Sequence, residues 1–262
     1  RRQRQMCIRD RSAMEVRKMK RIGKKLMYMA LSLFVIFQVY LFIRFYWIVS
    51  CFIPTYSMAP TLLGGDYIIV SMQIPGRRIM NSDSGRLLVH RLKGQREVQR
   101  NDVVVFNFPY AEDKEKMIIS MNTFYCKRCV GVPGDTCRWC EATGVREVYL
   151  PKIGDVLHID SCNYEHYYKC IEYETGKEMS LKMGQVYLED SLLESFRFNH
   201  KYYFMRGDNF NHSYDSRGWG ILPDDFILGV GQMIWFSKDE VTNRISWNRM
   251  FRSCLLYTSP SP

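Results

Sequence analysis

Beyond its first 25 residues the chain has almost no excess of positive charge. The formal net charge is +10, but residues 1–25 alone hold most of that excess, because eleven Lys and Arg there face only Asp10 and Glu15. A protein that reads nucleic acid needs a basic stripe on its folded domain, so we predict no nucleic-acid partner. The 262 residues are 47% hydrophobic and 14% aromatic, which is enough apolar material for a packed core.

The sequence also lacks internal repeats, low-complexity segments and, after residue 43, a convincing helical periodicity. After residue 43 the sequence instead contains short β-branched or aromatic runs bounded by Gly, Pro, Asn and Asp, which are typical of strands. These runs are "DYIIV" at 66–70, "DVVVFNF" at 102–108 and "EVYL" at 147–150. We therefore predict a mainly β fold, with an antiparallel sheet domain over residues 44–140 and 201–252 and a smaller β-rich lobe inserted at 141–200.

Residues 26–43 contain no charged side chain. A helix of this length is about 27 Å long, close to the hydrocarbon thickness of a bilayer. A cleaved signal peptide would have a shorter apolar stretch and a small-residue cleavage site, and a buried core helix would be apolar along one stripe only. We predict a transmembrane helix over residues 26–43.

Basic side chains precede this helix directly. Residues 14–25 include Arg17, Lys18, Lys20, Arg21, Lys24 and Lys25. The positive-inside rule places such a segment in the cytoplasm. We therefore expect a single-pass protein whose chain after Arg44 lies on the other side of the membrane.

The two ends of the chain look foreign to the rest. "RRQRQMCIRDRS" and "SCLLYTSPSP" resemble translated sequencing-adapter sequence. We expect residues 1–13 and 253–262 to be non-native tails and Met14 to be the natural start. Close packing of these tails against the folded domain would argue against this interpretation.

Ser57 follows the apolar segment within "IPTYSMAPT", and as a nucleophile it would need a base. None of the five histidines has the sequence context of a catalytic triad. They are His90, His158, His166, His200 and His212.

Lys127 is the alternative base, because it lies in an apolar β-like run followed by the turn Pro133-Gly134. A lysine in water has a pKa of about 10.4. Lowering that pKa by about three units costs roughly 4 kcal/mol, which requires apolar burial and no carboxylate partner.

Four motifs occur in order behind the apolar run. They are Ser57-Met58-Ala59-Pro60-Thr61-Leu62; Arg100-Asn101-Asp102 with Val103 to Phe106, ending at Pro109; Lys127-Arg128 with Gly131, Pro133, Gly134 and Asp135; and Gly207-Asp208-Asn209 with Ser213, Asp215, Ser216, Arg217 and Trp219-Gly220. Together they resemble the bacterial type I signal peptidase (leader peptidase) family of membrane-anchored Ser/Lys proteases. The resemblance extends from the anchor to about residue 252.

The resemblance implies a role for each motif. Ser57 is expected to be the nucleophile and Lys127 the general base, with Ser213 orienting the lysine amine. The Thr55 hydroxyl is expected to join the Ser57 N–H as the oxyanion hole. The expected structural ion pairs are Arg128 with Asp208 and Asp215 with Arg217.

The resemblance also implies a substrate and a location. The family cleaves signal peptides of exported preproteins after small residues, so we expect a shallow apolar pocket. Its predicted lining is Ile53, Pro54, Met58, Leu62, Tyr125 and Cys126. We expect no cofactor or metal, contact with membrane lipid and indirectly with the translocation machinery, and a place in the inner (cytoplasmic) membrane with the catalytic domain on the periplasmic face.

Cysteine spacing supports a competing hypothesis. Cys126, Cys129, Cys137 and Cys140 form C-x2-C-x7-C-x2-C, which is a possible zinc-binding module, although the pairs are close together for a zinc ribbon. In an oxidising compartment the candidate disulfides are Cys137–Cys140 and Cys162–Cys170. A further alternative is another Ser/Lys peptidase of the same clan, such as a self-cleaving repressor, but a membrane anchor does not suit a DNA-binding regulator.

Overall fold

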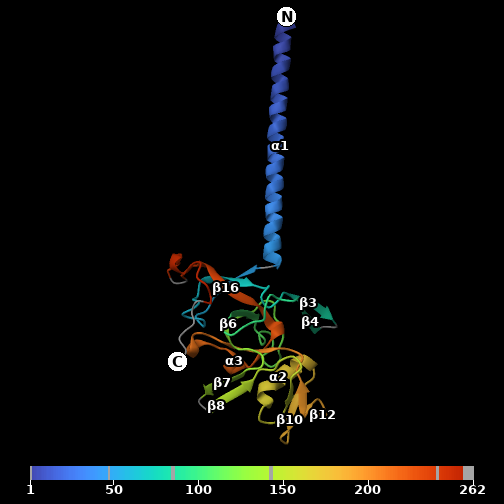
Figure 1. The fold of residues 1–262 in the computed structure, drawn as a ribbon, viewed down its shortest axis with the longest axis vertical. Coiled ribbons are helices and arrows are strands. Elements are labelled where there is room, and N and C mark those ends of the chain that lie inside the picture. Colours follow the sequence, from blue (N-terminus) through green and yellow to red (C-terminus); the bar gives the residue numbers. More distant parts are fainter. Residues whose placement is uncertain (1, 47, 84–85, 142–143, 240–241, 256–262) are drawn as a thin grey trace. The chain divides into compact units, whose positions relative to one another are not determined.

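A computed structural model describes the backbone of residues 2–46, 48–83, 86–141, 144–239 and 242–255. The chain divides into two compact units, residues 1–47 and 48–262. Figure 1 labels the main elements of both units.

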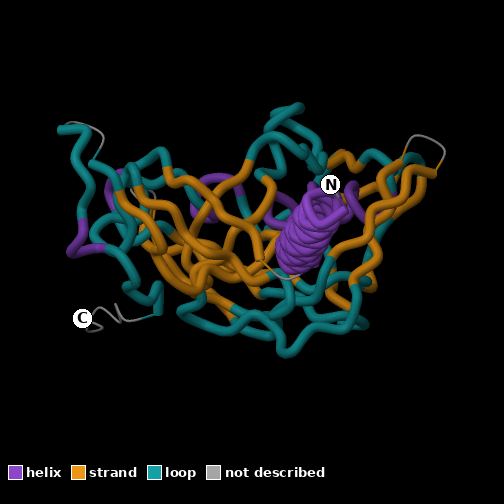
Figure 2. The backbone as a smooth tube through the Cα atoms, turned by 90° about the horizontal axis from the view of Figure 1, so that it is seen from above, coloured by secondary structure: helices purple, strands orange, loops and turns teal. Residues whose placement is uncertain are grey.

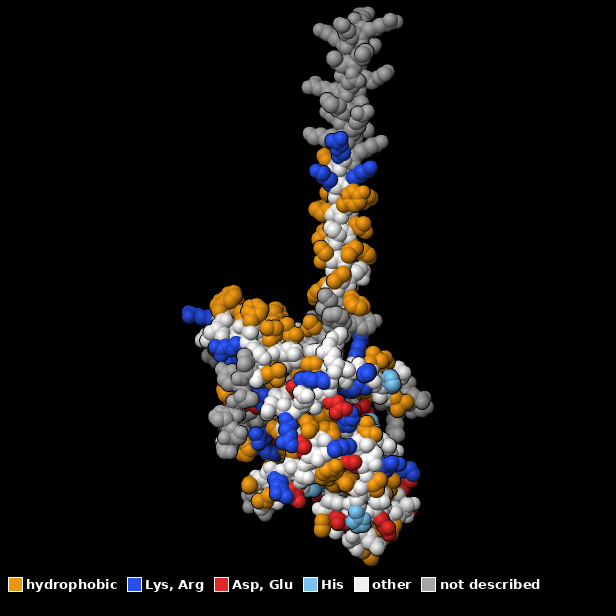
Figure 3. Space-filling view, in the orientation of Figure 1, with side chains coloured by type: hydrophobic (Ala, Val, Ile, Leu, Met, Phe, Trp, Pro, Cys, Tyr) orange, Lys and Arg blue, Asp and Glu red, His pale blue; other side chains and the backbone are white. Residues whose placement is uncertain are grey.

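The first unit is a single helix, α1 (Arg2–Tyr46). Its part Arg21–Phe42 is long and apolar enough to cross a membrane, in agreement with the predicted helix. Figure 3 shows hydrophobic side chains around this part and Lys and Arg at its N-terminal end. Such an all-round apolar surface is unfavourable in water and favourable in lipid.

The second unit contains a seven-stranded antiparallel sheet, as the β-branched runs predict. The strand order is β1-β2-β16-β5-β6-β14-β15, and Figure 2 shows the strands of this unit connected by long loops. The strands are β1 (Ile48–Ile53), β2 (Asp66–Ser71), β5 (Val103–Asn107), β6 (Phe124–Gly131), β14 (Tyr202–Arg206), β15 (Leu222–Pro223) and β16 (Ile227–Ser237).

Both faces of this sheet are covered. Every residue of β5 is buried, and successive side chains of a strand point to opposite faces. Val104 and Phe106 belong to the larger core cluster, whereas Val103 and Val105 belong to the smaller one. This two-sided burial explains why the strand is a continuous apolar run.

The remaining strands form small sheets. They are the hairpins β3 (Arg78–Asp83) with β4 (Arg86–Arg91) and β7 (Thr136–Glu141) with β8 (Gly144–Tyr149), the pair β9 (Val156–His158) with β13 (Ser195–Arg197), and the three strands β10 (Met179–Lys182), β11 (Gln185–Leu188) and β12 (Ser191–Leu192). The short helices are α2 (Tyr164–Thr175), α3 (Ser216–Trp219), η1 (Phe210–His212), η2 (Asp224–Phe226) and η3 (Trp247–Arg249).

Helix α2 lies within the segment predicted to be a β-rich lobe, and we did not predict it from the sequence. Its buried residues are Tyr167, Cys170 and Ile171, which share one helix face. The helix ends at Gly176, which adopts a left-handed φ of 71° that suits glycine. Tyrosines and charges distributed around the rest of "YEHYYKCIEYET" hide this narrow apolar face in the sequence.

The predicted disulfides are not formed, because all eight cysteines from Cys51 onward are free. Cys137 and Cys140 are three residues apart in β7, so their side chains point to opposite faces and their Cα atoms are about 10 Å apart, too far for a disulfide. Cys162 is exposed before α2 whereas Cys170 is buried within it.

The C-terminal part of the chain packs on the sheet as far as Cys254. This residue is buried in the smaller core cluster, and its N–H donates to the Gln232 carbonyl at 3.0 Å. Residues 256–262 lie outside the described residues, and the non-native origin of both ends stays a prediction.

Asp66 connects the start of β2 to this C-terminal part. Its fully buried carboxylate accepts hydrogen bonds from the Ser237 hydroxyl at 2.7 Å and from the Leu63 N–H at 2.8 Å. It also forms an ion pair with Arg249 at 2.6 Å. The negative charge is therefore balanced inside the protein by one guanidinium.

Arg249→Ala should lower the free energy of unfolding by about 3 kcal/mol, since it leaves a buried carboxylate without its charge partner. Urea denaturation of the full chain in detergent measures the change. The exposed Arg244 provides the control, and Arg244→Ala should change stability by less than about 0.5 kcal/mol. Equal losses in both variants would contradict the importance of the Asp66 ion pair.

Candidate active site

Strand β6 brings Lys127 to the loop that carries Ser57. The Lys127 Nζ and the Ser57 Oγ are hydrogen bonded at 2.6 Å, although the two residues are 70 positions apart in the sequence. Lys127 is only 4% exposed, and Ser57 is half-buried. The structure thus brings the predicted nucleophile and the predicted base into direct contact.

Local hydrogen bonds fix the Ser57 loop between β1 and β2. The Ala59 N–H donates to the Tyr56 carbonyl at 3.0 Å, and the Leu62 N–H donates to the Met58 carbonyl at 2.9 Å. Asn209, which lies outside this loop, also stabilises it, because the Asn209 N–H donates to the Ser57 carbonyl at 3.1 Å. These contacts position the Ser57 side chain opposite β6.

The pKa of Lys127 is lowered from its ordinary value. Burial is the main cause, because it disfavours the charged ammonium. The negative charges of Asp215 and Asp208 act in the opposite direction without outweighing burial. Among the described side chains no carboxylate lies within ion-pair distance of this amine, which is the environment that a neutral lysine requires.

Thr55 lies beside the same hydroxyl. Its Oγ1 is 3.3 Å from the Ser57 Oγ, and both residues line one cavity. The Thr55 side chain is therefore within reach of a group bound at Ser57, and its role in an oxyanion hole stays a prediction.

Ser213 is half-buried close to the Ser57 loop, and its hydroxyl oxygen is buried. A Cβ placed on Gly207 would lie 2.1 Å from the Ser213 Oγ and 2.5 Å from the Ser57 carbonyl oxygen. Only glycine fits between these two groups. Among the described residues, the Ser213 Oγ makes no hydrogen bond to the Lys127 amine, so the predicted bond is not formed here. The Ser213 hydroxyl instead lies near Asp215 and helps to lower the pKa of that carboxyl.

Both predicted ion pairs are formed near Lys127. Arg128 Nε and a terminal nitrogen donate to the two Asp208 oxygens at 2.7 and 2.6 Å. Arg217 binds Asp215 in the same two-pronged way at 2.8 and 2.9 Å. The Asp215 pKa is lowered because the hydrogen bonds from Arg217 and from the Gly207 N–H outweigh the effect of burial.

A cavity of about 350 Å³ contains the Ser57 and Lys127 side chains. Five of the predicted pocket residues line it, namely Ile53, Pro54, Met58, Tyr125 and Cys126. Leu62 is not among the lining residues, because it is fully buried in the smaller core cluster. The sequence analysis did not identify the other lining residues, which are Cys51, Phe52, Tyr56, Val105, Phe124, His212 and Tyr214.

The zinc hypothesis fails on strand geometry. Cys126 packs against the smaller core cluster and Cys129 belongs to the larger one, so their thiols lie on opposite faces of the sheet. Among the described residues, the side chains that gather with metal-binding spacing are His200, Asp224 and Asp225. The four cysteines do not converge on one point.

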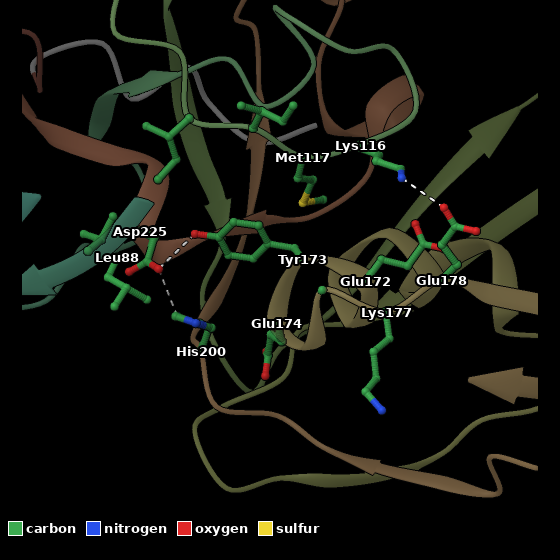
Figure 4. A pocket seen from close by; sticks show the side chains of 14 residues that line it. Leu88, Lys116, Met117, Glu172, Tyr173, Glu174, Lys177, Glu178, His200 and Asp225 are labelled. Atoms are coloured by element: carbon green, nitrogen blue, oxygen red, sulfur yellow. Dashed lines mark hydrogen bonds and ion pairs between the residues drawn. The ribbon is translucent and has the colours of Figure 1, made fainter. Parts of the chain in front are cut away.

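A second cavity, of about 440 Å³, lies beside α2 and is shown in Figure 4. The Tyr173 hydroxyl donates to Asp225 at 3.0 Å, and the His200 Nδ1 is 3.5 Å from the same carboxylate. Its described lining includes no serine, threonine or cysteine. The smaller cavity contains Ser57 hydrogen bonded to Lys127, which are the predicted nucleophile and base, and it is therefore the candidate active site.

Comparison with known proteins agrees with this choice. Residues 26–236 match the family model described as signal peptidase, peptidase S26. Signal peptidase I of Pseudomonas fluorescens is 30% identical over 226 residues, which cover 80% of this chain and 72% of that protein. Signal peptidase I of Aquifex aeolicus is 29% identical over 270 residues, covering 88% and 94%. The matched region includes the apolar helix and all four motifs, and the chain belongs to the peptidase S26 family of signal peptidases.

Proposed function

We propose that the chain is a membrane-anchored serine endopeptidase that removes N-terminal signal peptides from exported preproteins with Ser57 and Lys127. The observation that carries this proposal is the 2.6 Å hydrogen bond between the two side chains inside the cavity. The similarity to signal peptidase I of Pseudomonas fluorescens and of Aquifex aeolicus supports the substrate class.

The catalytic cycle begins with the neutral Lys127 amine, which accepts the Ser57 proton as Oγ attacks the scissile carbonyl carbon. The resulting ammonium then gives the proton to the leaving amine, and the signal peptide stays as an ester on Ser57. Lys127 next accepts a proton from water as the water oxygen attacks that ester. The bond between the acyl carbon and Ser57 Oγ then breaks, Lys127 returns the proton to Oγ, and the signal peptide leaves with a free carboxylate. Burial supports this cycle because it favours the neutral amine at the start of each proton transfer.

The negative oxygen that forms during attack needs hydrogen-bond donors. We assign this role to the Thr55 hydroxyl and the Ser57 N–H, since Thr55 Oγ1 lies 3.3 Å from the nucleophile. We assign Ser213 to orient the Lys127 amine. The Ser213 hydroxyl oxygen is buried and forms no hydrogen bond of ordinary geometry, so a bond to this amine in the working enzyme would satisfy it.

The membrane location follows from α1. We propose that it crosses the inner membrane once, with residues 14–25 in the cytoplasm and the unit from residue 48 onward on the periplasmic face. The run of Lys and Arg just before the apolar segment supports this orientation. The unit would then work beside membrane lipid and receive preproteins as the translocation machinery releases them.

Ser57→Ala should reduce cleavage of a model preprotein by about 10⁴-fold or more, because the ester intermediate can no longer form. The rate is measured with the full chain in detergent, by separating the preprotein from the mature product. Ser161→Ala removes an exposed hydroxyl outside the cavity and should cleave at the original rate. Equal rates for Ser57→Ala and the unchanged protein would refute the proposed nucleophile.

The pH dependence tests the base. Below the lowered pKa of Lys127 the amine is protonated and cannot accept a proton, so kcat/KM should rise with pH through an apparent pKa below about 10.4. Lys127→Arg should be inactive at every pH, since a guanidinium stays protonated. A profile that still rises at the ordinary lysine value, or an active Arg variant, would exclude this residue as the base.

Thr55→Val keeps the branched shape and removes the hydroxyl donor. We expect kcat to fall about 10²- to 10³-fold with little change in KM, because the donor acts on the transition state. Thr55→Ser should retain most of the activity. If Thr55 only stabilises the turn before Ser57, the Val variant will instead lose thermal stability or raise KM, and the Ser variant will offer no rescue.

A further inference from the structure

Two thiols line the cavity that contains the catalytic pair. Cys51 comes from β1, and Cys126 comes from β6, directly before Lys127. Both are free and half-buried. A serine peptidase does not need a thiol for its chemistry, so these two side chains are reactive groups that the proposed mechanism leaves unused.

The other described cysteines differ from this pair in position. Cys140 and Cys162 are exposed, Cys137 is half-buried, and Cys129, Cys170 and Cys254 are buried. None of these six lines the cavity with Ser57. A reagent that enters the cavity therefore has two thiol targets there, and the exposed and buried cysteines provide internal references.

We propose that Cys51 and Cys126 form a modification site at which a small disulfide blocks peptide cleavage by forming a mixed disulfide inside the substrate cavity. The site itself rests on the geometry, and its effect on cleavage rests on the proposed function. An adduct on either sulfur occupies part of the 350 Å³ cavity that the peptide must enter. An adduct on Cys126 would also lie close to Lys127, the proposed base, because the two residues are adjacent and line the same cavity.

The reaction is a thiol–disulfide exchange. The cysteine loses its proton, and its sulfur attacks one sulfur of the small disulfide, so that a new S–S bond forms as the old one breaks. The second half leaves as a thiolate and takes up a proton. The protein thiol is oxidised and the small disulfide is reduced, so no further oxidant is required, and a reducing thiol reverses the step.

The environment of the two thiols determines the rate of the thiol–disulfide exchange. Burial raises the pKa of Cys51 to about 11 and also raises the pKa of Cys126 above its ordinary value. Since the thiolate is the attacking form, exchange should be slow at neutral pH and faster as the pH rises. The exposed Cys140 and Cys162 should react before either cavity thiol.

The experiment treats the full chain in detergent with bis(2-hydroxyethyl) disulfide, a small uncharged probe. Peptide mapping by mass spectrometry follows the adduct at each cysteine, and preprotein cleavage is measured on the same samples relative to each untreated variant. We expect activity to fall at least tenfold as Cys51 or Cys126 is modified, and dithiothreitol to restore it. A bound signal-peptide inhibitor should slow modification of these two thiols only.

Variants identify the thiol responsible. The double variant Cys51→Ala, Cys126→Ala should keep most of its own untreated activity after treatment, whereas Cys162→Ala should be as sensitive as the unchanged protein. Loss of activity in the double variant, or full activity with both cavity thiols modified, would overturn the proposal. The proposal would also be overturned if the probe modified Cys140 and Cys162 but neither Cys51 nor Cys126. A chain that cleaves nothing before treatment refutes the proposed function instead, and the mapping then decides the modification site independently.

Discussion

The burial of one amine determines what the rest of the active site must provide. Lys127 has to lose its charge before it can accept a proton, and nearby carboxylates oppose that loss. The structure gives each carboxylate its own cation, Arg128 for Asp208 and Arg217 for Asp215. The two ion pairs therefore keep negative charge from acting fully on the lysine, in addition to shaping the backbone around it.

The site is assembled from segments that are distant in the sequence. The Ser57 loop, β6 and the segment after β14 meet through a small number of polar contacts. Thr61 donates to Asp208 at 2.5 Å, and Arg128 binds the same carboxylate. Because each of these contacts joins two segments, the geometry around Ser57 and Lys127 requires all three segments to be in place.

The sequence predicted the central strands because their β-branched runs leave few alternatives, and it predicted Ser57 with Lys127 because their motifs have specific spacing. It did not predict α2, whose apolar face consists of Tyr167, Cys170 and Ile171 among other tyrosines. Leu62 was assigned to the pocket, but an apolar residue in a loop can face a cavity or the core, and only packing decides. Cys51 had no motif to connect it with a strand that follows it by more than 70 residues.

Lys127 and Arg128 are neighbours in β6 and serve opposite purposes. Burial lowers the pKa of the Lys127 amine beside Ser57, while the next side chain, Arg128, forms an ion pair with Asp208. Strand residues alternate between faces, so a one-residue deletion between Phe124 and Lys127 would bring Arg128 to the nucleophile, and a one-residue insertion would bring Cys126 there instead. In this part of the chain the length of the strand is therefore under a stricter constraint than the identity of its apolar residues.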